Sequence, residues 1–146
     1  YRPEADVPEA MQQDSTPDAV ELFFLNLDWF IGHVRSLAMT AEDCCEDHGN
    51  FNVAYELHYF LTDHNALLDD PLNLMTPEQK SLLGLLRRVM VGVPARARQS
   101  TTVAAESLAN MRMPEWQEPR QQARQLLAAF EPILAARDNY WSKGSA

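Results

Sequence analysis

Four histidines lie among carboxylates and are the residues best suited to metal or proton chemistry. They are His33, His48, His58 and His64. A carboxylate-bridged di-iron centre in a helical bundle needs Glu-x-x-His pairs on facing helices, and the sequence contains no such pair. His58 and Asp63 have a His-x4-Asp spacing, but the further histidine pairs of a complete ligand set are missing. We therefore expect no metal and no cofactor. A helical metalloprotein or metal-dependent enzyme with His and Asp ligands is the alternative.

The only two cysteines, Cys44 and Cys45, are adjacent. Adjacent cysteines rarely form a disulfide with each other, and two thiols do not make the framework of a secreted domain, which predicts a reducing, cytoplasmic location. The flanking carboxylates should raise the thiol pKa values, which disfavours a nucleophile. No nucleophile elbow, glycine-rich phosphate loop or zinc motif is present, so we expect a protein that is not an enzyme.

The formal charge of −9 is unevenly distributed. Residues 1–79 contain sixteen acidic and two basic residues, whereas residues 80–146 contain ten basic and five acidic ones, and no Lys or Arg occurs between Arg35 and Lys80. This pattern predicts a strongly negative surface that repels nucleic acid and attracts a protein with a basic surface. The arginines between Arg87 and Arg124 are not interleaved with the aromatic platform that single-strand binders use.

Apolar residues recur at intervals of three and four along the chain, which predicts helices and no strands. We expect helices over about 17–47, 52–68, 76–92 and 97–111, and a last one from Pro114 or Pro119 that Pro132 kinks. Thr76-Pro77-Glu78-Gln79 is a strong start signal for the third helix. The predicted fold is all-α, an antiparallel bundle of four to five helices, with a short helical solenoid as the alternative.

The expected domain organisation is a single helical bundle over residues 15–141. Residues 1–14 have two prolines and few apolar groups and are predicted to be a mobile tail, and residues 142–146 a short C-terminal tail. The first residues do not have the pattern of a signal peptide. No apolar run approaches the length of a membrane span, so we expect no membrane association.

Two polar clusters are not required by the fold. The acidic cluster, placed at the end of the first predicted helix where the macrodipole disfavours anions, consists of Glu42, Asp43, Glu46 and Asp47. The second cluster lines the face of the second predicted helix opposite its apolar stripe and consists of Asn52, Tyr55, Glu56, Tyr59 and Asp63. Tyrosines interleaved with carboxylates are typical of protein-binding surfaces. An acidic end kept for solubility, and tyrosines that pack on a neighbouring helix, are the alternatives.

The first predicted helix has apolar residues on two sides. One stripe, from Val20 to Ala38, is predicted to face the core, and Leu22, Leu25 and Trp29 form a second cluster on the opposite side. The helix is therefore either central in the bundle or half of an interface. A self-associating adaptor or homodimer that uses Leu22, Leu25 and Trp29 is a further alternative.

Part of the chain resembles a known class of protein. The run from Tyr55 to Asp63, then Leu67-Leu68, the segment from Leu74 to Leu82 and Pro94 resemble small helical immunity proteins that accompany bacterial toxins. The resemblance covers about the middle third of the chain. It implies a cytoplasmic, non-enzymatic bacterial protein that occludes the active site or substrate cleft of a toxin. The acidic half fits this role independently, because toxins that act on nucleic acids tend to have basic clefts.

Overall fold

The structure, a computed structural model, describes residues 18–49, 51–63 and 66–144. The regular elements in these residues are helices, with no strand among them. The side chains of Asp63, Ala66 and Leu68 are outside the described set. The α-helices are α3 (Ala19–Ala38), α4 (Ala41–Asp47), α5 (Val53–Asp63), α6 (Ala66–Asp69), α7 (Pro77–Val91), α8 (Ala104–Met111), α9 (Gln117–Ala129) and α10 (Glu131–Gly144). Two 3-10 turns, η1 (Ala95–Ala97) and η2 (Pro114–Trp116), flank α8.

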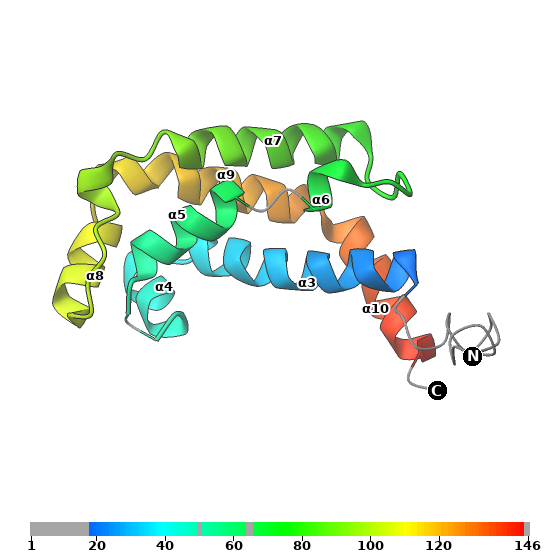
Figure 1. Cartoon of the computed structure of the whole chain (residues 1–146), viewed down its shortest axis with the longest axis horizontal. Helices are drawn as coiled ribbons and strands as arrows, with labels where there is room; N and C mark the ends of the chain where they lie inside the picture. Colours follow the sequence, from blue (N-terminus) through cyan, green and yellow to red (C-terminus); the bar gives the residue numbers. More distant parts are fainter. Residues whose placement is uncertain (1–17, 50, 64–65, 145–146) are drawn as a thin grey trace, which may run out of the picture.

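Three long helices, α3, α7 and α9, extend along the molecule (Figure 1). α9 runs antiparallel to the other two and packs against both, and α5 crosses obliquely and contacts α3 and α7. At one end α4 packs on α8, while α6 and α10 lie at the other end (Figure 1). Because α5 crosses α3, side chains from these two helices meet on one surface.

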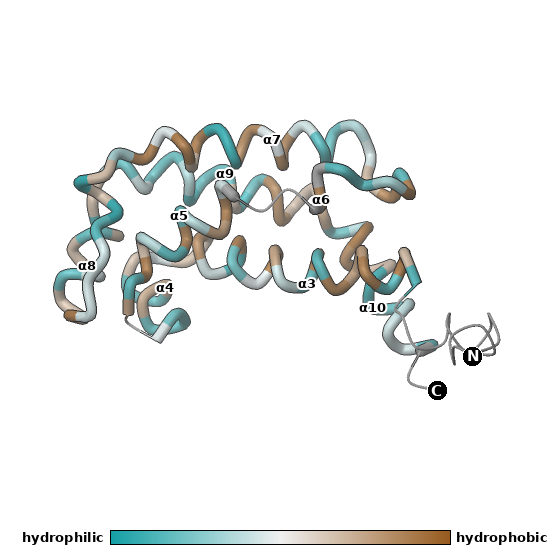
Figure 2. Tube along the Cα trace, in the orientation of Figure 1, coloured by the Kyte–Doolittle hydropathy of each residue, from teal (hydrophilic) through white to brown (hydrophobic). Residues whose placement is uncertain are grey.

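The core fills the space between α3, α5, α7 and α9. Figure 2 shows apolar and polar residues alternating along the long helices, as in helices that bury one face. The predicted stripe of the first helix is buried at Phe24, Leu27, Ile31 and Val34. Trp116, which the sequence analysis does not place, is completely buried, and its Nε1 donates a 2.7 Å hydrogen bond to the carbonyl oxygen of Ala97. This bond satisfies the one polar atom of the indole.

The prediction of one continuous helix over 17–47 is wrong, because the chain leaves the helix at Met39. Met39 has extended backbone angles (φ −75°, ψ 171°). The side chain of Thr40 then caps α4, because its hydroxyl oxygen accepts a 3.2 Å hydrogen bond from the backbone amide of Asp43. Glu42 and Asp43 therefore lie in the first turn of α4, where the helix dipole favours anions. The expectation that they oppose the dipole is overturned.

Other boundaries also differ from the prediction. The helix predicted over 52–68 is two helices, α5 and α6. The last predicted helix is divided into α9 and α10 at Phe130, just before Pro132. The helix predicted over 97–111 is shorter and corresponds to α8. α7 is confirmed with both hydrogen bonds of the Thr76 and Gln79 capping box. α3 is capped by Asp18. Ser15 and Thr16, whose side chains could cap a helix that begins at Pro17, lie outside the described residues. The all-α class is confirmed, but a bundle of four to five helices is not.

The described part of the chain has no helix of sufficient length and apolar content to cross a membrane. The predicted N-terminal tail, residues 1–14, lies outside the described residues. α10 continues to Gly144, beyond residue 141, where the sequence analysis ends the domain.

Arginines of the basic half, residues 80–146, cap the C-terminal ends of helices in the acidic half, residues 1–79. Arg87 donates to the carbonyl oxygen of Thr62 at the end of α5, at 2.9 Å. From α9, Arg124 donates to Ala38 and Arg120 to Met39, at 2.8 and 2.9 Å. Terminal carbonyls lack intrahelical partners and carry the negative end of the dipole, so a cation there supplies both a hydrogen bond and charge complementarity.

Ion pairs also join the two halves. Arg137 contacts Asp28 at 2.9 Å, Arg112 contacts Glu42 at 3.0 Å, and Lys80 lies 3.5 Å from Asp70. Part of the charge asymmetry that the sequence shows is therefore compensated within the molecule.

Candidate functional site

A connected set of aromatic rings crosses the surface from α3 to α5. Trp29 of α3 contacts Phe60 of α5 edge to face with ring centroids 4.9 Å apart, Phe60 contacts Tyr59 at 5.3 Å, and Tyr59 stacks on Tyr55 at 6.5 Å. We call these four residues the aromatic face. The exposed fractions of Trp29, Tyr55 and Tyr59 are 43%, 45% and 50%. A contiguous group of large rings therefore remains accessible to a partner.

The aromatic face follows from the amphipathic pattern of α5. Val53, Leu57 and Leu61 of this helix are buried in the core. Tyr55 and Tyr59 are four residues apart on another side, where consecutive turns place them one above the other. This confirms that the tyrosines lie away from the core stripe, as the sequence predicts.

Two imidazoles connect the aromatic face to α4. The His33 ring lies 4.5 Å from that of Trp29 and 5.8 Å from that of His48, and its Nδ1 donates to the carbonyl oxygen of Trp29. A 3.1 Å hydrogen bond joins Nδ1 of His48 to Ser36 Oγ. Burial, and then the neighbouring His33, lower the pKa of His48 below its ordinary value. His48 is therefore mainly neutral at pH 7.

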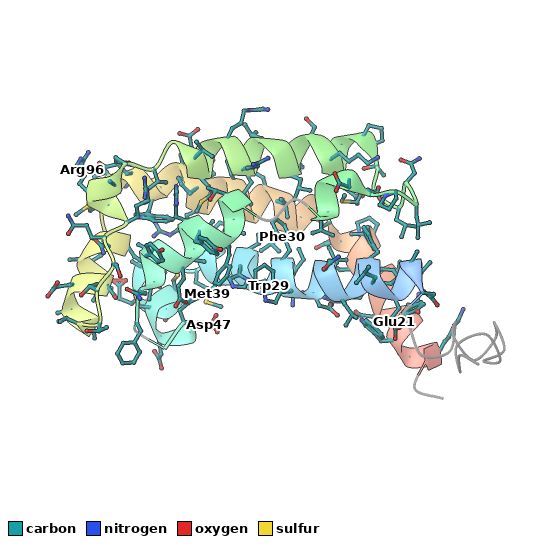
Figure 3. All side chains as sticks on the ribbon, in the orientation of Figure 1. Glu21, Trp29, Phe30, Met39, Asp47 and Arg96 are labelled. Atoms are coloured by element: carbon teal, nitrogen blue, oxygen red, sulfur yellow. The ribbon has the colours of Figure 1, made fainter. Side chains whose placement is uncertain are left out.

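Exposed carboxylates lie on α4, the helix that ends at His48, and Glu56 of α5 approaches the same histidine. Glu56 Oε2 lies 3.7 Å from His48 Nε2, on the side of α5 that faces α4. Asp43, Glu46 and Asp47 are exposed and have no ion-pair partner within the described ranges. Figure 3 labels Trp29 on α3 and Asp47 at the end of α4. We call Asp43, Glu46, Asp47 and Glu56 the acidic border. His48 thus connects the two clusters that the sequence analysis treats separately.

Other predicted site residues have different surroundings. The Glu42 carboxylate accepts hydrogen bonds from Arg112, and its pKa is lowered by a backbone hydrogen bond first and by Arg112 second. The Asn52 amide oxygen accepts a 2.7 Å hydrogen bond from the Thr101 amide, so this side chain ties α5 to the segment before α8. The side chain of Asp63 lies outside the described residues.

The predicted apolar cluster on α3 is divided. Leu22 and Leu25 are 51% and 46% exposed, whereas Trp29 belongs to the aromatic face through its contact with Phe60. Leu22 also lines a small groove with Phe23 of α3 and Leu72 of the loop before α7. An exposed apolar surface therefore continues along α3 beyond the aromatic face.

The histidines do not assemble into a ligand set in the described structure. No group of three or more His, Cys, Asp or Glu side chains there is arranged to hold a metal ion. Nε2 of His58 is buried without a hydrogen-bond partner, and burial lowers the pKa of this residue. His64, the fourth histidine of the sequence, lies outside the described residues.

The two cysteines are free and buried. Burial raises the pKa of Cys44 to about 11, and it is also the largest cause of the raised pKa of Cys45. The predicted direction is confirmed, but burial is a larger cause than the surrounding carboxylates.

Sequence reasoning missed three members of this surface. The apolar spacing of the second predicted helix puts Phe60 on its inward stripe with Leu57 and Leu61, but Phe60 is only half-buried, and neither His33 nor His48 is assigned a place. One local signal was available, since His33 follows Trp29 by four residues and must lie on the same side of α3. No protein-family profile, curated protein or solved structure matches the chain.

Proposed function

We propose that the protein acts by binding another protein through the aromatic face and the acidic border. The observation that carries this proposal is the continuous ring contact among half-exposed Trp29, Tyr59 and Tyr55. Tryptophan and tyrosine are the residues most enriched at energetic hot spots, because they bury a large area at a small loss of side-chain entropy. Contiguous apolar surface on a monomer commonly marks an interaction site.

The partner has a basic surface. The exposed carboxylates of Asp43, Glu46 and Asp47 lie in a segment, residues 36–79, that has no Lys or Arg of its own. A surface of one sign steers an oppositely charged partner and raises the association rate, while buried aromatic contacts slow dissociation.

The specific form that we propose is a toxin-neutralising immunity protein. Its support is the resemblance of the segment from Tyr55 to Leu82 to such proteins, together with an acidic surface suited to the basic cleft of an enzyme that acts on nucleic acid. In this proposal the protein is bacterial and cytoplasmic, has no enzymatic activity, and inhibits by covering the cleft of its partner stoichiometrically.

The test uses three immobilised forms of the protein exposed to a lysate of the source cells. They are the wild type, Tyr59→Ala on the aromatic face, and Val91→Ala at an exposed position at the end of α7. The wild type and Val91→Ala should retain the same protein, and Tyr59→Ala should retain at least about tenfold less of it. The retained protein should be basic, and one equivalent of the wild type should inhibit its activity. A retained protein that is acidic, or that all three forms bind equally, would contradict the proposal.

Self-association is a second candidate, favoured by a separate observation. Leu22 and Leu25 are about half exposed on α3, and Leu72 lies beside Leu22. No other described helix covers these leucines, so a second copy of the chain is a suitable cover for them.

A further inference from the structure

Tyr55 and Tyr59 are the stacked pair of the aromatic face, whose other ring contacts are edge to face. The planes of Tyr55 and Tyr59 differ by 8°, and their ring centroids are 6.5 Å apart. This distance is at the long end of the range for stacked aromatic rings, about 4.5–7 Å, so the two rings cover little of each other. Two parallel π-faces remain accessible on one side of α5.

Negative charge lies beside these rings. Glu56 precedes Tyr59 by three residues on α5, so the two side chains occupy neighbouring positions of the helix surface. The Glu56 carboxylate is also 3.7 Å from His48 Nε2. Because burial lowers the pKa of His48, this imidazole is mainly neutral at pH 7 and leaves the charge of Glu56 uncompensated. Asp47, which precedes His48, adds a second exposed carboxylate.

The described residues place no cation on the tyrosine pair. The acidic segment 36–79 has no Lys or Arg, and no described Lys or Arg side chain contacts either ring. The nearby arginines that the structure describes are engaged elsewhere, since Arg87 and Arg98 donate to the carbonyl oxygens of Thr62 and Val93. The rings are therefore open to a cation from another molecule.

We propose that Tyr55, Tyr59 and Glu56 bind an arginine side chain of the partner, an inference that rests on the proposed function. A guanidinium is planar and weakly hydrated, so it stacks on an aromatic face while its N–H groups reach a neighbouring carboxylate. A lysine ammonium is a compact, strongly hydrated point charge that gains less from a ring face. The surface therefore selects arginine over lysine at equal charge.

The test compares two synthetic Gly/Ser peptides of equal length, one with four arginines and one with four lysines. Their affinities for the full chain are measured by titration calorimetry at low and moderate salt. The arginine peptide should bind about threefold to fivefold more tightly than the lysine peptide, the gain expected for one exposed cation–π contact. The preference should persist at moderate salt while both affinities fall.

Variants separate stacking from charge. Tyr55→Leu with Tyr59→Leu should abolish the preference for arginine, whereas Tyr55→Phe with Tyr59→Phe should keep it, because phenylalanine retains the π-face. Glu46→Gln with Asp47→Asn should lower the affinity for both peptides by the same factor. Val91→Ala, far from the rings in sequence and at a more exposed position than either tyrosine, should change neither affinity. Circular dichroism of each variant establishes that the helices are intact.

The outcomes distinguish this inference from the proposed function. Equal affinity of the wild type for both peptides, or a preference that survives the leucine variant, would overturn the arginine inference and leave binding of a basic partner intact. Failure of both peptides to bind at low salt would overturn both proposals. Because the wild-type ratio of affinities is itself decisive, the test does not depend on the folding of any variant.

Discussion

His48 has a lowered pKa, which should make the stability of the molecule sensitive to mild acid. Its pKa is lowered by burial and by His33, and that of His58 is lowered by burial, then by Arg98. A depressed pKa means that the unfolded chain takes up these protons more readily than the folded one. The free energy of unfolding should be highest above the ordinary histidine pKa of about 6.5 and should decrease as pH falls through that value.

We therefore predict a lower urea midpoint at pH 5.5 than at pH 7.5, a window above the ordinary pKa of carboxylates. His48→Gln with His58→Gln should flatten this pH dependence. The measurement is urea unfolding followed by circular dichroism at several pH values. An unchanged pH dependence in the double variant would assign the effect to other groups.

Cys44 illustrates a residue whose chemistry is suppressed by its position. A pKa of about 11 leaves roughly a thousandth of the thiol ionised at pH 8, and the side chain has no solvent exposure. We predict that the native protein reacts with a disulfide reagent at least about a hundredfold more slowly than the urea-unfolded protein. The absorbance of the released thiolate measures both rates, and Cys44→Ala identifies the contribution of Cys45. Rapid reaction in the native state would contradict the buried placement.

At the scale of elements, the break between α3 and α4 brings the end of α4 close to His33, beside the aromatic face. It allows α4 to turn away from the axis of α3, so that His48, at its end, reaches both His33 of α3 and Glu56 of α5. The break depends on the Thr40 cap and on the two arginines of α9 that bind the carbonyl oxygens at the end of α3.

The cap gives a direct prediction. Thr40→Ala removes the acceptor for the Asp43 amide and should lower the free energy of unfolding by about 1 kcal/mol. Thr40→Ser keeps the hydroxyl and should leave stability within a few tenths of a kcal/mol of the wild type. Both values come from urea unfolding at pH 7.5. Equal losses in the two variants would show that the threonine methyl group, and not the cap, stabilises the break.

At the scale of the whole molecule, internal pairing decides which carboxylates are available to a partner. Glu42 is occupied by Arg112, whereas Asp43, Glu46 and Asp47 have no such partner among the described residues. Some acidic residues of the first half therefore form ion pairs with basic residues of the second half, whereas these three of the exposed border are left unpaired in the described part of the chain.

Neutralising Asp43, Glu46 and Asp47 should slow association with the basic partner at low salt, with much less effect at high salt, where screening already operates. The dissociation rate should change little. Stopped-flow measurements at two salt concentrations test this. The control is Glu78→Gln at the start of α7, which removes one negative charge outside the acidic border. Association that depends on neither salt nor these residues would make the border only a solvated surface.

Self-association is likewise a property of the whole molecule. We predict a dimer of the 16.6 kDa chain in solution, which Leu22→Glu with Leu25→Glu should convert to a monomer because charges cannot be buried unpaired in a seam. Val91→Glu introduces a charge at another exposed apolar position and should leave the mass unchanged. Light scattering gives both masses. A monomeric wild type would exclude the dimer.

The sequence by itself determined the helical class and several helix starts. Helical periodicity and capping are local properties, so the apolar stripe of α3 and the capping box at Thr76 could be predicted correctly. The Thr40-Ala41-Glu42-Asp43 start signal was equally local but was missed, because continuous apolar spacing favoured one long helix. The exposed tyrosines were predictable from the face of α5 opposite its core residues.

Only the tertiary structure decided which of these residues lie together. Trp29 and Phe60 are thirty-one positions apart and meet because α5 crosses α3. The pairing of Glu42 with Arg112 likewise depends on the packing of α4 against α8. Local spacing fixes the side of a helix on which a residue lies, but it contains no information about the crossing of two helices, which depends on how their side chains pack. The composition of the candidate surface therefore emerges only from the folded chain.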